Sequence, residues 1–409
     1  MKAVVFHDVG DIRLDEVPEP KIQESNDAIV RLTASAICGT DLHFIRGTMP
    51  GMKEGTIIGH EGVGIVEKTG PGLRNVKEGD RVVICPTIAC GYCSYCRAGY
   101  FSQCDNSNPN GPRAGTAFFG GPAESGAING LQAEKARVPF ANVGLVKIPN
   151  EVTDDQAIML SDIFPTGYFG ADIAEVEPGN TVAVFGCGPV GQFTILSALL
   201  LGAGRVIAVD CVPMRLEMAR DQGAEVVNFE EDDPVEAILQ LTGGIGVDRS
   251  IDAVGIDAIH AHSGPAAEKS RQMEEEFQRE LKLVAPKTHP QNGTWRPGDG
   301  PSQAIIWALE SLAKAGTLAI IGVYPQTAQF FPLGAAMERN ITVQMGNCNH
   351  RKYIPTLMEM VKSGAVDPEV YISNVEPFDS VLEAYRAFDE RQPGWIKVEL
   401  VPRMHLAAV

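Results

Sequence analysis

Residues 180–210 read "NTVAVFGCGPVGQFTILSALLLGAGRVIAVD", and this stretch decides the fold. An apolar run, a glycine-rich turn, an apolar segment of helical length and a second apolar run follow one another. Because two parallel strands need a long crossover connection, usually a helix, the order predicts a strand–helix–strand unit. The alternation continues to about residue 346 and therefore predicts a doubly wound parallel sheet with helices on both faces.

Further elements of this half are expected from apolar runs of strand length and from helical patterns. The expected strands are 224–229, 247–255, 317–324 and 341–348, and the expected helices are 234–243 and 302–316. The segment between them, about 256–300, is longer than an ordinary loop and begins with a charged helical run. A lid, a subunit contact, a cofactor clasp and a plain surface excursion all remain open for it. His260 and His262 in this segment could be metal ligands, but a solvated loop is the simpler interpretation.

The glycine turn has the spacing G-x-G-x-x-G between a strand and a helix. At that place glycines let the backbone approach a pyrophosphate, and the helix N-terminus offers free N–H groups. Asp210 ends the second strand, where a carboxylate bonds ribose hydroxyls and repels a 2′-phosphate, which favours NAD over NADP. Arg215 is expected either to stack on adenine or to lie on a solvated helix face. The expected turn residues are Gly186, Gly188, Pro189, Val190 and Gly191.

Composition excludes several classes. The 409 residues carry a formal charge of −18 and show no cluster of Lys and Arg, which makes nucleic acid an unexpected partner. No run of eighteen apolar residues occurs, so no membrane span is expected, and the N-terminus lacks the pattern of a signal peptide. We therefore expect a cytoplasmic protein, and a chain of this length suggests two domains.

Four cysteines follow the spacing C-x2-C-x2-C-x7-C within "CGYCSYCRAGYFSQC". Four thiolates give a closed tetrahedral site for structural zinc, whereas iron–sulfur clusters use other spacings. An iron–sulfur cluster and plain buried cysteines remain as alternatives. The expected ligands are Cys90, Cys93, Cys96 and Cys104.

Two other segments, "SAICGTDLHFIRG" and "IIGHEGVGIVEKTG", contain further candidate ligands. Taken singly, Cys38 and His60 would more often be buried core residues. Together with the four-cysteine lobe, the "CGTDLH" and "GHE" motifs closely resemble the zinc-dependent medium-chain alcohol dehydrogenases. The resemblance implies that Cys38 and His60 bind a catalytic zinc. It also implies two zinc ions per chain, one catalytic and one structural, with NAD as the second cofactor.

In many members of that family the third ligand is a cysteine. Here "LSDIFPTGYFGA" has Asp162 in that place, which is similar to the glutathione-independent formaldehyde dehydrogenase and formaldehyde dismutase branch. One thiolate, one imidazole and one carboxylate would leave a fourth position open for water or substrate. Asp41 is expected to accept a hydrogen bond from the far nitrogen of His60. Glu61 is expected either to bind zinc transiently or to lie just behind its ligands.

The resemblance also implies a proton relay and cofactor contacts. Thr40 would take the substrate proton and His43 would pass it on toward solvent, a task that suits histidine as a residue type. Thr166 and the backbone at Val323 would lie near the nicotinamide. Lys397 would lie near the pyrophosphate, although a surface position is an equal alternative.

The implied fold is α/β, with a β-rich GroES-like catalytic domain and a doubly wound parallel-sheet (Rossmann) NAD domain. The catalytic domain takes residues 1–160 and 347–409, and the NAD domain takes 161–346 with its insertion at about 256–300. The implied reaction is hydride transfer between an alcohol or hydrated aldehyde and NAD, including formaldehyde oxidation or dismutation. A secondary-alcohol or polyol dehydrogenase and a non-catalytic NAD-binding protein are the alternatives. A homodimer or homotetramer is expected.

Overall fold

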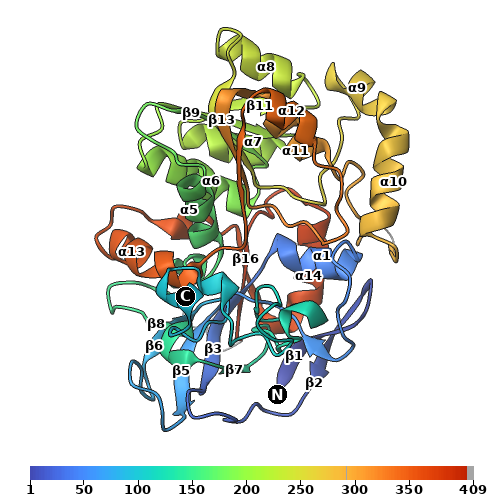
Figure 1. The fold of residues 1–409 in the computed structure, drawn as a ribbon. Helices are drawn as coiled ribbons and strands as arrows, with labels where there is room; N and C mark the ends of the chain where they lie inside the picture. The colour runs from blue at the N-terminus through green and yellow to red at the C-terminus, as the bar shows by residue number, and fades with distance from the viewer. Residues whose placement is uncertain (292, 403–409) are drawn as a thin grey trace. The chain divides into compact units, whose positions relative to one another are not determined.

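The computed structural model describes residues 1–291 and 293–402. The chain divides into two compact units. The first contains Met1–Pro165, Thr288–Trp295 and Asn347–Val409, and the second contains Thr166–Lys287 and Arg296–Gly346. Figure 1 colours both units by residue number, so the late return of the chain to the first unit can be followed in red.

Two sheets build the first unit. The larger has the strand order β15-β16-β3-β5-β6-β8, with β7 paired to β3, and the smaller has the order β2-β1-β4. The large sheet is mostly antiparallel, with only β15 and β16 parallel. The strands are β1 (Lys2–Asp8), β2 (Asp11–Glu16), β3 (Ala28–Ile37), β4 (Thr56–Ile57), β5 (Gly62–Thr69), β6 (Arg81–Ile84), β7 (Lys135–Val138), β8 (Leu145–Lys147), β15 (Asn374–Pro377) and β16 (Val398–Val401).

The helices of this unit are short apart from two near the C-terminus. The most informative is α1, which begins directly after β3 and ends at Gly47, whose φ of +83° and N–H bond to His43 O form a left-handed cap. The α-helices of the first unit are α1 (Gly39–Arg46), α2 (Ser94–Arg97), α3 (Ala141–Gly144), α4 (Asp154–Met159), α13 (His350–Lys362) and α14 (Val381–Asp389).

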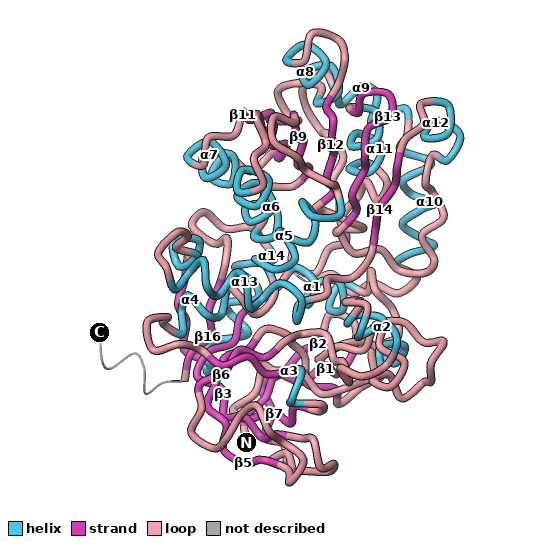
Figure 2. The backbone as a smooth tube through the Cα atoms, turned by 60° about the vertical axis from the view of Figure 1, so that its left-hand side comes forward, coloured by secondary structure: helices cyan, strands magenta, loops and turns pink. Residues whose placement is uncertain are grey.

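The second unit is built on one six-stranded parallel sheet with the order β11-β10-β9-β12-β13-β14. Numbered within the unit this order is 3-2-1-4-5-6, that of the Rossmann fold. The strands are β9 (Thr181–Phe185), β10 (Arg205–Asp210), β11 (Glu225–Asn228), β12 (Val247–Asp252), β13 (Leu312–Ile320) and β14 (Thr342–Met345). Figure 2 shows them in magenta with cyan helices around them.

Both faces of this sheet are buried. Along β9, Ala183 and Phe185 belong to one apolar cluster, whereas Val182 and Val184 belong to another. Alternate residues of a strand point to opposite faces, so the near-continuous apolar run at 181–185 fits a strand covered on both sides. The helices are α6 (Pro189–Leu200), α7 (Pro213–Asp221), α8 (Pro234–Leu241), α9 (Ala266–Gln272), α10 (Glu274–Val284), α11 (Gln303–Glu310) and α12 (Leu333–Glu338); α5 (Ile163–Ile173) runs across the division between the units.

Two expectations from sequence differ from the structure. The helix expected over 302–316 ends at Glu310, because Leu312 already pairs with Val247 in the sheet and Ala315 has a φ of +59°. The insertion does not lie wholly in the second unit. Thr288–Trp295 belongs to the first, where the Trp295 side chain is buried in an apolar cluster and the backbone N–H of Trp295 donates to Asp389 Oδ2 over 2.7 Å.

Within the described residues, no helix combines the length and the apolar character that crossing a membrane requires.

Candidate metal centres and dinucleotide turn

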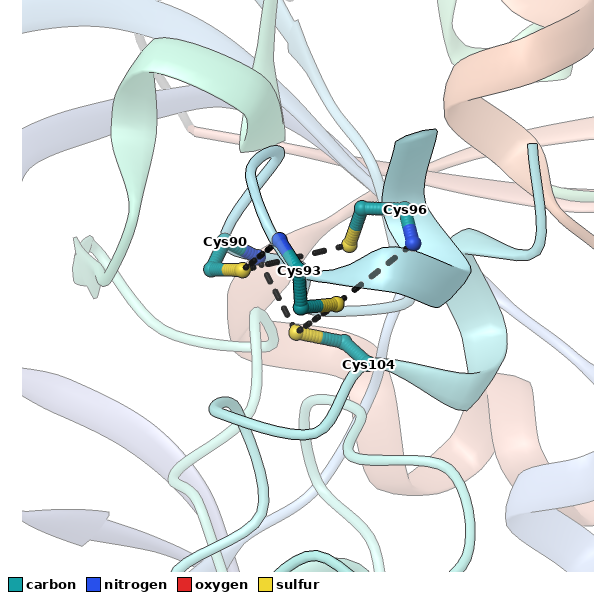
Figure 3. A group of neighbouring side chains, drawn as sticks. All are labelled: Cys90, Cys93, Cys96 and Cys104. Carbon is teal, nitrogen blue, oxygen red and sulfur yellow. Dashed lines mark hydrogen bonds between the residues drawn. The ribbon is translucent and has the colours of Figure 1, made fainter. Parts of the chain in front are cut away.

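The four-cysteine lobe gathers all its sulfurs in one place. The Sγ atoms of Cys90 and Cys96 are 4.0 Å apart, as are those of Cys93 and Cys104, and none of the four is in a disulfide. Tetrahedral zinc with bonds of 2.3 Å would separate its sulfurs by about 3.8 Å. Figure 3 shows the four side chains directed at a common centre. The spacing therefore fits one closed ion.

Backbone N–H groups support these sulfurs. The N–H groups of Cys93 and Tyr92 point at Cys90 Sγ over 3.4 and 3.5 Å, and that of Cys96 points at Cys93 Sγ over 3.4 Å. Burial is the largest single influence on Cys93 and opposes its ionisation, but hydrogen bonds from the N–H groups of Cys96 and Asp105 and from the Cys96 and Cys90 side chains together lower the pKa of that thiol to about 7. Such donors stabilise thiolates, the form in which cysteine binds zinc.

A second cluster brings together Cys38, His60, Glu61 and Asp162, all of them buried, with one ligand atom of each within 4.8 Å of the others. Asp162 Oδ2 lies 3.2 Å from His60 Nε2 and 3.6 Å from Cys38 Sγ. These separations are those between neighbouring ligands of one tetrahedral ion. The three sequence-predicted ligands thus converge, although Asp162 lies more than a hundred residues along the chain from Cys38 and His60.

Local structure positions each of these groups. Cys38 is the N-cap of α1 at the end of β3, and Asp162 immediately precedes α5. His60 and Glu61 lie between β4 and β5, after Gly59, which has a φ of +86°. A Cβ on Gly59 would come within 2.4 Å of Gln132 Cγ, so this approach requires glycine.

Asp41 supports the cluster from behind. Its Oδ2 accepts hydrogen bonds from the N–H of Cys38 at 3.0 Å and from the hydroxyl of Tyr385 at 3.1 Å. Its Oδ1 lies 3.2 Å from His60 Nδ1 without hydrogen-bond geometry, and neither atom has a partner among the described residues. A small rotation of the imidazole would complete that bond and aim Nε2 at an ion, so this buried pair fits a metal ligand held by a carboxylate.

The charges of the cluster also fit a cation. Burial raises the pKa of the Cys38 thiol, so the group is costly to ionise without a positive charge beside it. A bound divalent ion deprotonates a coordinating thiol outright. Burial alone would also raise the pKa of Asp162, but hydrogen bonds from His350 and His60 bring it well below its usual range.

His350 is a contact that sequence reasoning missed. Its Nε2 lies 2.8 Å from Asp162 Oδ1, and its Nδ1 lies 3.3 Å from Thr87 Oγ1. His350 begins α13, far along the chain, in the segment "GNCNHRKY" that carries no recognisable motif. What the sequence did offer was a histidine in the C-terminal segment, where the chain comes back to the first unit.

Lys397 and Glu61 form a fully buried ion pair. Lys397 Nζ lies 2.7 and 2.5 Å from the two Glu61 oxygens and donates to Ile37 O over 3.1 Å, with both side chains at 0% exposure. Burial raises the pKa of Glu61, and the opposing effect of Lys397 leaves it at about 7. The surface position considered for Lys397 is therefore wrong, and its ammonium group is engaged with Glu61.

The expected relay residues lie on one helix. Thr40 and His43 are three positions apart in α1 and so share a face, and His43 Nδ1 is 3.3 Å from Thr48 Oγ1. Phe118 lies edge-on to His60 with ring centroids 6.4 Å apart and is stacked on Phe44 at 6.2 Å. An aromatic surface thus adjoins the cluster.

In the second unit, the glycine turn connects β9 to α6. Gly186 has a φ of +88°, and a Cβ on Gly191 would lie 1.8 Å from Gly186 O, so both glycines are required by the turn itself. Gly188 is the N-cap of α6, with Pro189 as the first helical residue and Val190 next. A Cβ on Gly188 would meet nothing nearer than Arg215 at 3.7 Å. That open approach to a helix N-terminus fits a dinucleotide pyrophosphate.

Asp210 and Arg215 lie beside this turn. Asp210 accepts hydrogen bonds from the N–H groups of Cys187 and Cys211, each at 2.7 Å. The Arg215 side chain is 13% exposed, with Nη1 3.9 Å from Asp210 Oδ2, so the solvated helix face considered for it is wrong. Val323 O accepts from the N–H of Ile256 over 2.9 Å, and Thr166 is the first residue of the second unit, within α5.

Comparison with known proteins shows which protein family the chain resembles. Residues 24–150 match the model of the alcohol dehydrogenase GroES-like domain, and residues 189–263 match that of the zinc-binding dehydrogenases. A zinc-type alcohol dehydrogenase-like protein of Bacillus subtilis, itself uncharacterized, is 39% identical over 406 residues, which cover 98% of this chain and 100% of that one.

Two further relatives agree. The alcohol dehydrogenase TADH from Thermus sp. ATN1 has a solved structure with a TM-score of 0.78 and 33% identity, covering 98% of this chain and 100% of that one. The glutathione-independent formaldehyde dehydrogenase of Pseudomonas aeruginosa is 40% identical over 281 residues, or 65% of this chain and 69% of that protein. The chain belongs to the zinc-dependent alcohol dehydrogenase family and is an oxidoreductase with zinc and a nicotinamide dinucleotide as its cofactors.

Proposed function

We propose that the chain transfers a hydride between a small alcohol or hydrated aldehyde and NAD, with formaldehyde among its substrates. The observation that carries the proposal is the ligand set in which Asp162 joins Cys38 and His60. The partial match to a formaldehyde dehydrogenase supports the choice of substrate. Asp210 supports NAD over NADP, since a second negative charge beside its carboxylate would be repelled.

Cys38, His60 and Asp162 would hold the catalytic zinc, and the four cysteines of the lobe would hold the structural one. When bound, zinc supplies a Lewis acid for the substrate oxygen, and NAD supplies the hydride acceptor. The remaining tasks fall to this chain's own residues. Asp41 Oδ1, 3.2 Å from His60 Nδ1, would orient that ring once the bond between them forms, and His350 holds Asp162 by its second oxygen.

Thr40 accepts the proton of the substrate hydroxyl and releases its own hydroxyl proton, and His43, three positions along α1, is the residue that passes a proton on toward solvent. Histidine suits that task because it changes charge near neutral pH. Phe118 and Phe44 give the substrate an apolar wall, which favours small or aromatic alcohols over sugars. Lys397 keeps Glu61 paired behind the ligands. Its three donors are taken by Glu61 and Ile37 O at 0% exposure, so the pyrophosphate contact expected for it is not part of the proposal.

The test is to incubate the purified protein with formaldehyde, first without added NAD and then with it. Equal amounts of methanol and formate without added NAD would indicate dismutation on a retained cofactor, whereas formate and NADH only with added NAD would indicate a dehydrogenase. Turnover of secondary alcohols or polyols with no turnover of formaldehyde would contradict the proposed substrate and favour the alternative dehydrogenase.

A further inference from the structure

A third group of potential metal ligands lies in the second unit, away from both clusters described above. It consists of His260, His262 and Asp299, which bring one ligand atom each within 4.8 Å of the others. Asp299 Oδ2 is 2.9 Å from His262 Nε2 and 3.7 Å from His260 Nε2. Glu274 Oε2, at the start of α10, lies 3.4 Å from His260 Nε2 and adds a negative charge beside the group.

These distances match those around one ion. Zinc bonds of about 2.0–2.1 Å in a tetrahedron separate neighbouring ligand atoms by about 3.3 Å. The separations of 2.9 and 3.7 Å between Asp299 Oδ2 and the two ring nitrogens lie on both sides of that value. The ligand types also match, since imidazole and carboxylate are common ligands of zinc and related divalent ions.

The far nitrogen of each histidine is already held. His260 Nδ1 lies 3.0 Å from Ala261 O, and His262 Nδ1 lies 3.3 Å from Glu230 Oε1. A carbonyl or carboxylate oxygen cannot donate, so each Nδ1 carries the hydrogen. At His262 the ion-free arrangement also needs a hydrogen on Nε2, which lies 2.9 Å from Asp299 Oδ2, and a bound ion would replace that hydrogen. In a neutral ring the Nε2 atom then presents a lone pair. This support by a carbonyl and a carboxylate is typical of metal-binding histidines.

Those lone pairs face negatively charged oxygens. The two Nε2 atoms converge on the Asp299 carboxylate, with Glu274 beside His260, and such groups repel one another unless a cation or protons lie between them. A divalent ion would neutralise the two carboxylates. The alternative is that protons alone, carried on the imidazoles, hold the cluster together.

The backbone fixes the arrangement in advance. Asp299 Oδ1 accepts from the N–H of His260 over 3.1 Å, which turns Oδ2 toward the rings. The N–H of Gly300 donates to Ala258 O over 3.0 Å, so two sides of the insertion are tied together here. The His260 ring is stacked on Phe277 of α10, with centroids 5.6 Å apart at 9°, and its side chain is 11% exposed.

We infer that His260, His262 and Asp299 form a third zinc-type divalent metal site that fastens the two ends of the 256–300 insertion to each other. The ligands come from the segment after β12 and the segment before α11, and Glu230 supports His262 from the segment after β11. We assign the site a structural role. Figure 1 shows α9 and α10 as consecutive gold helices between these segments.

The test is metal content at a fixed, buffered concentration of free zinc. The wild type should bind three zinc ions per chain, and His262→Ala should bind two. His262 is the most exposed ligand, with 53% of its side chain accessible, so this change is the least disruptive to folding. Asp299→Asn is a second variant, because it keeps the oxygen that accepts from the N–H of His260. His7→Ala is the matched control, since it removes another histidine–carboxylate contact, that with Asp15 at 2.7 Å.

Hydrogen exchange supplies a second readout. In the wild type, raising free zinc should slow exchange in 257–263 and 296–300, and His262→Ala should abolish that response while His7→Ala retains it. Two zinc ions in the wild type, or equal zinc content in the wild type and both cluster variants, would overturn the inference and leave a proton-held cluster.

Discussion

The buried pair of Lys397 and Glu61 makes Lys397→Met the sharpest test of how the candidate catalytic site is held. Methionine keeps a long unbranched side chain but removes the charge and three hydrogen bonds, two to Glu61 and one to Ile37 O. Both partners have 0% exposure, so the carboxylate left behind has no access to water. Breaking a buried pair from one side costs about 3–5 kcal/mol of unfolding free energy. We expect a loss of that size.

The measurement is urea unfolding of the first unit at a fixed zinc concentration, because ligand binding shifts apparent stability. Trp295 and Trp395 belong to this unit, whereas Trp307 belongs to the second. A Trp307→Phe background used in every sample therefore makes tryptophan fluorescence report on the first unit alone.

The matched control is Lys362→Met, since that lysine is 38% exposed and pairs with Glu359 at 3.5 Å. An exposed pair contributes about 0–1 kcal/mol. The double variant Glu61→Gln/Lys397→Met should recover about 2 kcal/mol or more relative to Lys397→Met, because it leaves no unpaired charge. If Lys397→Met and Lys362→Met unfold within about 1 kcal/mol of each other, the reasoning about the buried pair is refuted.

Three further predictions concern single side chains. Asp162→Ala should lose one zinc per chain while the four-cysteine lobe keeps its own; unchanged metal content by mass spectrometry would contradict Asp162 as a ligand. Thr40→Val should keep zinc and NAD binding but lower kcat by about 10²-fold or more, as for a lost proton-transfer group, and near-normal kcat would exclude the relay. Glu399→Gln tests a pH effect: burial, with Asp155 and Asp154 nearby, raises the pKa of Glu399 to about 8. The folded state thus binds this proton more tightly than the unfolded chain does. The bound proton therefore contributes fully to the unfolding free energy below about pH 4.3, and this contribution is lost as pH rises toward 8, by at most about 1.4 kcal/mol per pH unit. In denaturation curves, the unfolding free energy of Glu399→Gln should fall less steeply with pH than that of the wild type. The same pH dependence in both proteins would contradict the assignment to Glu399.

The parts of the fold that the sequence predicted are those set by local patterns. The strand and turn over 181–191 follow from apolar runs and glycine spacing, and both glycines that the turn needs are the ones in the motif. The end of α11 was misjudged because "LAKAG" continues an amphipathic helical pattern, whereas in the structure Leu312 already belongs to a strand and pairs with β12. Long-range pairing overrides local propensity at such a boundary.

The insertion could not be predicted for a related reason. Its placement depends on contacts between distant residues, such as Trp295 with Asp389 and Gln291 with Gly10, and no local pattern encodes them. His260 and His262 read as solvated for the same reason, since the carboxylates beside them come from positions 230, 274 and 299. A sequence shows potential ligands, but only the fold shows which acceptors face them.

The aspartate at position 162 accounts for the presence of a histidine at position 350. A cysteine in that place would offer a single ligand atom, whereas a carboxylate has two oxygens and needs a partner for the second when it is buried. Asp162 directs Oδ2 toward Cys38 and His60, and its Oδ1 lies 2.8 Å from His350 Nε2. Thr87 Oγ1, 3.3 Å from the other ring nitrogen, fixes the orientation of that imidazole. A thiolate at 162 would leave His350 without this acceptor. We therefore expect Asp162→Cys alone to leave the ligand at position 162 poorly ordered, and a second substitution at His350 to restore its order.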